Sequence, residues 1–356
     1  MTAAASVAGG DRPLMKDLAT LDDLPVDYVD ALRGANLVPL WPALRALMPP
    51  AKPRSTTQTT HWPWAAIRPL LLRAGELTPI EKAERRVLVL ANPGRGLDNL
   101  QASSVIYLGM QLVLPGETAP NHRHTPNAAR IVVEGEGACT VVSGERCDMR
   151  HGDLVLTPSG TWHEHRHEGS GPFMWLDVLD LPVMVYLDIS YVVPGDPQAR
   201  DTRASAYAAP GVVPRIGGVR TSARHPLLRF AWEQTRDALQ SLAAATPRDE
   251  LVEVAYVNPE TGGDALDTIA FSAILLRPGE SQQLVPASPA RVFHVVEGAG
   301  RCHVDERTID FVPGDTFCAP GFARIELDNG GARLPLCFIT ADESPVHRKL
   351  GVYETR

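Results

Sequence analysis

Histidines are concentrated in one part of this sequence of 356 residues. Six of the eleven histidines lie between positions 122 and 167, and two alternating pairs stand out, His122 with His124 and His163 with His165. In a β-strand, residues two positions apart point to the same face, so each pair presents two imidazoles together. If antiparallel strands curl these pairs into a small barrel, three imidazoles meet on its inner face. Such a set binds a metal ion and leaves coordination positions open, as in catalytic metal sites.

Both pairs belong to longer motifs. The first reads G-x5-H-x-H and ends at His124, and the second reads G-x5-P-x-G-x2-H and ends at His163. This spacing resembles the two motifs of the cupin superfamily, so His122, His124 and His163 are the predicted metal ligands. The glutamate that cupins usually add falls here on Ala128 or Ala129. The predicted ligand set is therefore three neutral imidazoles, which leave a divalent ion its full charge and suit a chelating anionic substrate.

The sequence that must position these motifs is β-rich and duplicated. Short apolar runs separated by Gly, Pro and Asn fill residues 86–185 and 250–342. VVEGEG at 132–137 recurs as VVEGAG at 295–300, an offset of 163, which indicates a duplicated domain rather than a short-period repeat. The second copy has no ligand side chains at the three predicted ligand positions, which hold Val285, Ala287 and Ile325.

Helical signals lie outside the two β-rich blocks. Residues 25–34 are predicted to form a helix, residues 49–60 an extended linker, and a further helix is expected to begin at Thr78-Pro79-Ile80. Residues 225–243 read as an amphipathic helix with Leu228, Trp232 and Leu239 on its buried face. The predicted organisation is an N-terminal tail and helical segment (1–85), a metal-binding barrel (86–190), a linker with the amphipathic helix (191–249), a degenerate metal-free barrel (250–345) and a C-terminal tail (346–356).

Composition excludes several classes of protein. The formal net charge is −8 without a basic tract, which argues against nucleic-acid or membrane-surface binding. An anionic substrate must then be bound by a few local cations. No apolar run approaches the ~20 residues that cross a bilayer, and the N-terminus lacks the apolar core of a secretory signal. The five scattered cysteines are odd in number, as expected for reduced thiols in the cytoplasm.

A more specific resemblance covers nearly the whole chain beyond the first twenty residues. The segments NLVPLW (36–41), AGELTPIEKAERRVLVLANPG (74–94), GDLVLTPSGTWHEH (152–165) and WLDVLDLP (175–182) are similar to the gentisate 1,2-dioxygenase family. That family includes salicylate, 5-substituted salicylate and 1-hydroxy-2-naphthoate dioxygenases. The resemblance implies a mainly β bicupin, with two double-stranded β-helix (jelly-roll) barrels, an N-terminal helical segment and a connecting helix.

The resemblance also implies an activity. Members bind one Fe(II) per chain in the N-terminal barrel and use O2 as co-substrate. They insert both oxygen atoms between the carboxylate-bearing and hydroxyl-bearing carbons of a 2-hydroxybenzoate, in aromatic catabolism. A 2-hydroxybenzoate can chelate Fe(II) through its carboxylate and phenolate oxygens and leave one position for O2. A homotetramer is expected on the same basis.

Carried over residue by residue, the resemblance assigns further roles. Arg130 is expected to pair with the substrate carboxylate. Gln111 is expected to hydrogen-bond the substrate or an iron-bound oxygen. His165 is expected to contact the substrate phenolate or a superoxide, as proton donor or electrostatic stabiliser. Arg86 is expected to be a second cation near the substrate, chosen over its neighbour Arg85 on the family match alone. Asp177 is expected to orient a pocket His or Arg, although pairing with a structural Arg is the alternative. Likewise, Arg130 could be a strand-edge cation. His167 is expected either to line the pocket mouth or to face solvent.

The sequence departs from the family beside the predicted carboxylate clamp. Where the family often has Gln-Ser-Ala-Leu-Arg-Phe, residues 126–131 read Pro-Asn-Ala-Ala-Arg-Ile, which removes bulk at Ala129 and Ile131. This favours a salicylate with another 5-substituent, such as 5-nitrosalicylate, over gentisate. Two other classes stay open: a three-His cupin isomerase or diketone dioxygenase with Zn or Mn, and a non-enzymatic storage or ligand-binding bicupin.

Overall fold

The computed structural model describes residues 18–51, 53–195, 215–216, 219–220, 227–331 and 333–356. The chain divides into two compact units, Met1–Ser55 and Thr56–Arg356. In the first unit, a 3-10 helix (Leu21–Asp23) precedes α1 (Val26–Gly34) and α2 (Leu44–Leu47), and α1 confirms the helix expected at 25–34. Within the described part of this unit, none of these helices buries a residue.

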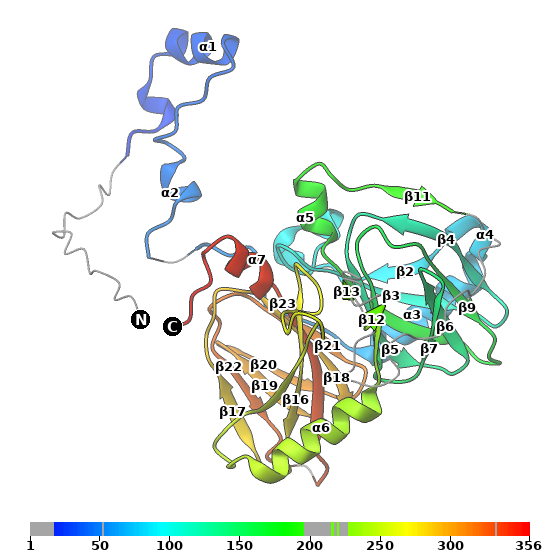
Figure 1. Ribbon diagram of the computed structural model, residues 1–356. Helices are drawn as coiled ribbons and strands as arrows, with labels where there is room; N and C mark the ends of the chain where they lie inside the picture. Colours follow the sequence, from blue (N-terminus) through cyan, green and yellow to red (C-terminus); the bar gives the residue numbers. More distant parts are fainter. Residues whose placement is uncertain (1–17, 52, 196–214, 217–218, 221–226, 332) are drawn as a thin grey trace. The chain divides into compact units, whose positions relative to one another are not determined.

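The first β-rich block of the second unit forms two facing antiparallel sheets. The larger sheet has the strand order β14-β8-β5-β10-β3-β2, and the smaller has the order β11-β4-β9-β6-β7. Most of their strands are drawn in cyan and green in Figure 1. This is the predicted first barrel. Its strands are β2 (Arg86–Val89), β3 (Tyr107–Val113), β4 (Thr118–His124), β5 (Ala128–Glu134), β6 (Ala138–Val142), β7 (Glu145–Met149), β8 (Leu154–Thr157), β9 (His163–His167), β10 (Phe173–Leu179), β11 (Val192–Pro194) and β14 (Arg229–Phe230).

The second block repeats this architecture, as the sequence duplication predicts. One sheet has the order β1-β21-β18-β23-β16-β15 and the other the order β17-β22-β19-β20. The strands are β1 (Thr60–Trp62), β15 (Val252–Tyr256), β16 (Ala270–Leu276), β17 (Ser281–Leu284), β18 (Arg291–Glu297), β19 (Gly300–Val304), β20 (Arg307–Phe311), β21 (Thr316–Ala319), β22 (Ile325–Asp328) and β23 (Leu336–Asp342). A separate hairpin pairs β12 (Arg215–Ile216) with β13 (Val219–Arg220).

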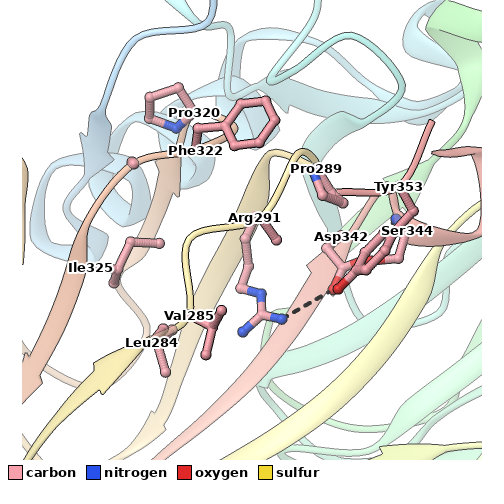
Figure 2. A pocket seen from close by; sticks show the side chains of 12 residues that line it. Leu284, Val285, Pro289, Arg291, Pro320, Phe322, Ile325, Asp342, Ser344 and Tyr353 are labelled. Atoms are coloured by element: carbon pink, nitrogen blue, oxygen red, sulfur yellow. Dashed lines mark hydrogen bonds and ion pairs between the residues drawn. The ribbon is translucent and has the colours of Figure 1, made fainter. Parts of the chain in front are cut away.

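The interior of the second barrel is filled by aromatic rings. Phe293 stacks on Phe317 with ring centroids 4.8 Å apart, and Phe311 and Phe338 pack against them. At the mouth of this barrel, a small pocket is lined by the counterparts of the three predicted ligands, together with Arg291 paired to Asp342 (Figure 2). The counterparts are Val285, Ala287 and Ile325, whose side chains carry no atom that binds a metal.

Two helices connect the barrels through the same kind of hydrogen bond. α3 (Trp64–Leu77) contacts β2 and β3 of the first barrel, yet the Trp64 amide donates to Asp315 of the second barrel. α6 (Trp232–Ala245) contacts β15 and β16 of the second barrel, yet the Trp232 amide donates to Asp153 of the first. This reciprocal arrangement gives the repeated Gly-Asp turns of the two barrels their structural role.

The glycine of the first of these turns is required by sterics. Gly152 has φ +78°, and a Cβ there would lie 2.5 Å from the ring of Trp232. Both the left-handed backbone and the close indole exclude a larger residue at this position.

Several segments differ from the sequence predictions. Strands β1, β11 and β14 lie within the predicted N-terminal segment (1–85) and linker (191–249), yet they pair with barrel strands. The amphipathic helix begins at Trp232 rather than at 225, because Arg229–Phe230 pair with β8 instead. α3 was not predicted, whereas α4 (Ile80–Ala83) begins where expected. Leu228, Trp232 and Leu239 are buried as predicted.

Short helices complete the fold. They are the 3-10 helices Pro93–Arg95 and Leu97–Asn99, α5 (Leu181–Tyr186) after the last strand of the first barrel, and α7 (Ser344–Lys349) after the last strand of the second. Among the helices that the structure describes, none combines the length and apolar character needed to cross a membrane.

Candidate active site

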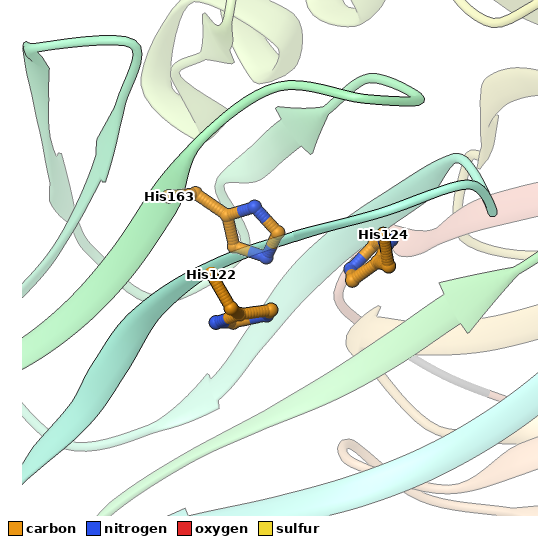
Figure 3. A group of neighbouring side chains, drawn as sticks. All are labelled: His122, His124 and His163. Carbon is orange, nitrogen blue, oxygen red and sulfur yellow. The ribbon is translucent and has the colours of Figure 1, made fainter. Parts of the chain in front are cut away.

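The three predicted ligands converge inside the first barrel. His122 and His124 lie on β4, and His163 lies opposite His122 on the paired strand β9 (Figure 3). One ring nitrogen from each of the three lies within 4.8 Å of the others, and the ring centroids of His122 and His163 are 4.1 Å apart. The predicted convergence is confirmed, and it follows from the i, i+2 spacing on β4 combined with the β4–β9 register.

Each of the three imidazoles is held in the same way. The Nδ1 atom of each ring lies within hydrogen-bond distance of the backbone carbonyl two residues away: His122 to Pro120 at 2.7 Å, His124 to Pro126 at 2.8 Å and His163 to Thr161 at 3.0 Å. A carbonyl only accepts, so Nδ1 carries the proton and the Nε2 lone pair is free to bind a metal. The Nε2 of His163 is buried and has no hydrogen-bond partner among the described residues.

The electrostatic surroundings keep these rings neutral. Burial lowers the pKa of His122 to about 3 and that of His124 to about 4, and it lowers the pKa of His163 well below the ordinary value. The positive charges of Arg85 and Arg130 act in the same direction. Neutral imidazole is the ligand form that metals bind, and three nitrogen donors fit iron as well as zinc, copper or nickel. The residues present therefore fit a divalent ion.

Arg130 and Asp177 lie opposite each other on the wall of the larger sheet. Asp177 on β10 pairs in register with Arg130 on β5, and the Arg130 Nε is 3.3 Å from the Asp177 carboxylate. Arg130 Nη1 donates to Thr157 Oγ1 at 2.7 Å, and Trp175 Nε1 donates to Asp177 at 2.9 Å. Both charged side chains are buried, so Arg130 is no strand-edge cation, and Asp177 lies where it can orient it.

Gln111 lies on the same wall, one strand further along. It is opposite Trp175 in the β3–β10 register, so it shares the inner face of the sheet with Asp177. Its side chain is buried, and its Nε2 finds no hydrogen-bond partner in the described part of the chain. A buried amide donor in this state is available to a ligand.

Arg86 does not face this wall, so its predicted position is wrong. Arg86 pairs in register with Leu112, which places it on the outer face of the sheet. There it donates to the backbone carbonyl of Gly75 in α3 and forms an ion pair with Glu117. The preceding residue, Arg85, lies just before the strand, and its charge interacts with Asp177 and Tyr107 on the inner wall, so Arg85 is the cation on the inner side. The family match alone could not decide between two neighbouring arginines.

Arg85 lies within electrostatic reach of the site. Its charge acts on Asp177 and Tyr107 and lowers the pKa of His122. Its Nη2 is buried, lies 3.6 Å from the exposed carboxylate of Glu84 and makes no hydrogen bond to any described residue. Arg85 is thus a cation that an anionic ligand in the barrel could satisfy.

Tyr107 also lies on the inner wall, although the sequence predictions gave it no role. Tyr107, Gly109 and Gln111 alternate along β3 on one face. A Cβ on Gly109 would lie 2.7 Å from the Tyr107 hydroxyl, so the phenol ring lies along the strand over that glycine. Burial, together with Asp177, raises the pKa of Tyr107, so its hydroxyl stays protonated. The alternation on β3 was the signal that could have identified it.

The side-chain hydroxyl of Thr140 contacts the imidazole of His165. Its Nδ1 is 2.8 Å from Thr140 Oγ1, and Thr140 Oγ1 itself donates to the sulfur of Met149 at 3.2 Å. Burial lowers the pKa of His165 well below its ordinary value, so the ring is neutral.

His167 neither lines the pocket mouth nor faces solvent. It is buried, its Nε2 lies 2.5 Å from the Gly171 carbonyl, and its ring packs 5.7 Å from that of Phe173. Both alternatives predicted for it are wrong, because the β9–β10 turn folds back over the ring. The structure assigns His167 a structural role.

Comparisons with known proteins agree with this geometry. Residues 109–179 match the family model described as "Cupin domain". The chain is 55% identical over 342 residues to a gentisate 1,2-dioxygenase of Ralstonia sp, an alignment that covers 96% of each protein. The chain belongs to the gentisate 1,2-dioxygenase family.

Other members of this family and their structures extend the similarity. A 5-aminosalicylate 1,2-dioxygenase of Comamonas sp is 36% identical over 93% of this chain and 89% of its own length. The crystal structure of salicylate 1,2-dioxygenase from Pseudoaminobacter salicylatoxidans with gentisate is 32% identical and superposes with a TM-score of 0.87, covering 96% of this chain and 95% of the other. The mainly β bicupin fold predicted from the sequence is confirmed.

Proposed function

We propose that this protein is an Fe(II)-dependent dioxygenase that opens the ring of gentisate, inserting both atoms of O2 between the carboxylate-bearing and hydroxyl-bearing carbons. The observation that carries the proposal is a set of three neutral imidazoles whose Nε2 atoms are free, beside the buried cation Arg130 and the partly buried Arg85. The high identity to a gentisate 1,2-dioxygenase supports the same reaction. These observations favour a ring-cleaving enzyme over the isomerase, diketone dioxygenase and ligand-binding alternatives.

Gentisate is the better candidate than 5-nitrosalicylate. The 5-nitrosalicylic acid 1,2-dioxygenase of Bradyrhizobium sp is 27% identical over only 38% of this chain, against 55% over 96% for the Ralstonia gentisate enzyme. The loss of bulk at Ala129 and Ile131, which favoured another 5-substituent, is located on the wall next to Arg130. Ala129 and Ile131 are each one residue from Arg130 on β5, so both point to the opposite face of the sheet. Both belong to the packed core outside the barrel, so their size does not shape the pocket.

Substrate binding in this proposal uses the two arginines. Arg130 and Arg85 surround the only carboxylate on this part of the described inner wall, Asp177, and outnumber it. An aromatic carboxylate entering the barrel therefore meets net positive charge. The planar guanidinium of Arg130, already oriented by Asp177 and Thr157, suits a carboxylate. His122, His124 and His163 would hold a ferrous ion that the hydroxybenzoate could chelate, and the chemistry supplied there would be the transfer of ring electrons to dioxygen.

His165 is the proposed acceptor of the substrate proton. In the tautomer in which Nδ1 donates to Thr140, the Nε2 of His165 is an acceptor, so the neutral ring can take the proton from the 2-hydroxyl group of the substrate. The imidazolium formed in this step can return that proton later. Burial lowers the pKa of His165 well below its ordinary value, so the ring is neutral before the substrate binds, and its expected contact with the substrate phenolate stays a prediction. Gln111 Nε2 is the unused donor beside it for a substrate oxygen.

A homotetramer in the cytoplasm is also proposed. Apolar side chains are exposed over the first unit, including Val26, Val38 and Leu47, and over the end of α5, including Tyr186 at 85% exposure. We take these exposed apolar side chains as candidate contacts between subunits. Light scattering on the purified protein measures the mass, and a monomer would contradict the proposal.

The substrate assignment is tested with a panel. Apo protein reconstituted anaerobically with Fe(II) is mixed with gentisate, salicylate, 5-aminosalicylate and 5-nitrosalicylate, and oxygen uptake gives kcat/KM for each. The highest kcat/KM is expected for gentisate. A higher value for 5-nitrosalicylate would refute the assignment of gentisate, and no uptake with any of them would refute the enzyme class.

A further inference from the structure

A buried carboxylate lies directly behind the metal-binding turns of the first barrel. Asp180 follows strand β10 and is completely buried. Its two oxygens accept from the Asn127 backbone amide and from Asn127 Nδ2, both at 2.8 Å. The bidentate contact fixes both the backbone and the side chain of Asn127.

Asn127 in turn holds both of the turns that carry metal ligands. It follows Pro126, whose carbonyl lies 2.8 Å from His124 Nδ1 and sets the tautomer of that ring. On its other side, Asn127 Oδ1 accepts from the Ser159 amide at 3.0 Å, in the turn that leads to His163. One asparagine therefore joins the β4–β5 turn to the β8–β9 turn, and Asp180 holds that asparagine.

The second barrel contributes to the same cluster. Thr268, which lies just before β16, donates from Oγ1 to Asp180 Oδ2 at 2.5 Å. The duplication repeats this contact in reverse. Glu343, 163 residues after Asp180, accepts from the Ala290 amide of its own barrel and from Ser103 Oγ and the Val105 amide of the first barrel. Each barrel thus holds a loop of the other through one buried carboxylate.

We propose that Asp180 is a positioning residue for the metal centre: through Asn127 it fixes the turns that orient His124 and His163, and through Thr268 it braces them against the second barrel. The metal-free barrel then has a role in the chemistry of the first one. The inference rests on the proposed metal site. Ligand-orienting partners of this kind change metal affinity by about 10- to 100-fold when they are removed.

The duplication supplies a matched control for the test. Asp180→Asn places an amide NH2 opposite the donors Asn127 Nδ2 or Thr268 Oγ1. Glu343→Gln does the same to the donors of Glu343, none of which belongs to the turns that carry the three predicted metal ligands. Apo wild type and both variants are titrated anaerobically with Co²⁺ against a competing chelator. The dissociation constant, the visible absorbance bands and the Tm of each apo protein are recorded.

The expected result is a 10- to 100-fold weaker Co²⁺ affinity and altered bands for Asp180→Asn, with an unchanged dissociation constant for Glu343→Gln despite a lower Tm. Unchanged affinity in Asp180→Asn, or equal weakening in both variants, would overturn the inference. If Asp180→Asn fails to fold, Thr268→Val decides: at least threefold weaker binding supports the bracing and unchanged binding overturns it. A wild type that binds no Co²⁺ would refute the proposed metal site itself, an outcome distinct from tight binding by Asp180→Asn.

Discussion

Two neighbouring arginines, Arg85 just before β2 and Arg86 at its first position, are expected to have different effects when each is replaced by methionine. Arg85 projects to the inner wall, where its buried Nη2 has no hydrogen-bond partner among the described residues. Arg86 projects to the outer face, where it is buried and paired with Glu117. Methionine keeps much of the apolar volume of each side chain and removes its charge. The two substitutions therefore separate substrate binding from stability.

The magnitudes follow from the contacts. A hydrogen bond to a charged group contributes about 1.5–3 kcal/mol, so Arg85→Met is expected to lower kcat/KM for gentisate by about 10- to 150-fold. Its stability changes little, because the exposed Glu84 at 3.6 Å is a weak partner. Arg86→Met leaves Glu117 unpaired. Breaking a buried pair costs about 3–5 kcal/mol, and the lower end applies here because Glu117 keeps the Leu114 amide as a donor.

Oxygen uptake and urea unfolding of Fe(II)-loaded protein measure both quantities on the same preparations. Arg85→Lys serves as the conservative variant, and it is expected to recover part of kcat/KM because it restores a charge without the planar fork. A large loss of kcat/KM in Arg86→Met at temperatures where it stays folded, with little loss in Arg85→Met, would refute the assignment of the two strand faces.

Three further outcomes are expected. Burial holds the pKa of His294 at about 3 against an ordinary 6.5, so unfolding takes up a proton below pH 6.5 and the protein becomes less stable as the pH is lowered. In urea unfolding, wild type should lose about 2 kcal/mol more stability than His294→Leu when the pH is lowered from 7 to 5. Equal losses in the two proteins would contradict this. Gly152→Ala should lower stability by about 2–4 kcal/mol because its Cβ meets Trp232, with Co²⁺ affinity unchanged as the check that the metal site is remote. Thr140→Val removes the acceptor of His165 Nδ1–H, so kcat should fall about tenfold with little change in KM, and an unaltered kcat would exclude His165 as the base.

The sequence predicted the metal ligands because their spacing carries its own geometry. The i, i+2 pair His122 and His124 shares one face in any strand, and the motif ending at His163 had a repeat in the second block for comparison. The same comparison identified Val285, Ala287 and Ile325 as positions without ligand atoms. Local periodicity and internal duplication are properties of the amino-acid sequence itself, so the order of residues alone is enough to recognise both.

The remaining features depend on contacts between distant segments. Arg85 and Arg86 have the same chemistry, and only the pairing of Arg86 with Leu112 decides which one faces the barrel. Strand β14 was read as the start of a helix, since its pairing with β8 depends on residues more than seventy positions away. Asp180 gave no signal, because an aspartate at the end of a strand is ordinary until Thr268 is seen beside it.

The central claim is that one ferrous ion held by three imidazoles carries out the ring opening. The direct measurement is an anaerobic titration of apo protein with Fe(II), followed at each point by gentisate-dependent oxygen uptake. Activity is expected to rise linearly, to stop at one Fe(II) per chain, and to be absent at every iron level in His163→Ala. Activity that persists in the apo protein, or that His163→Ala retains, would contradict the account.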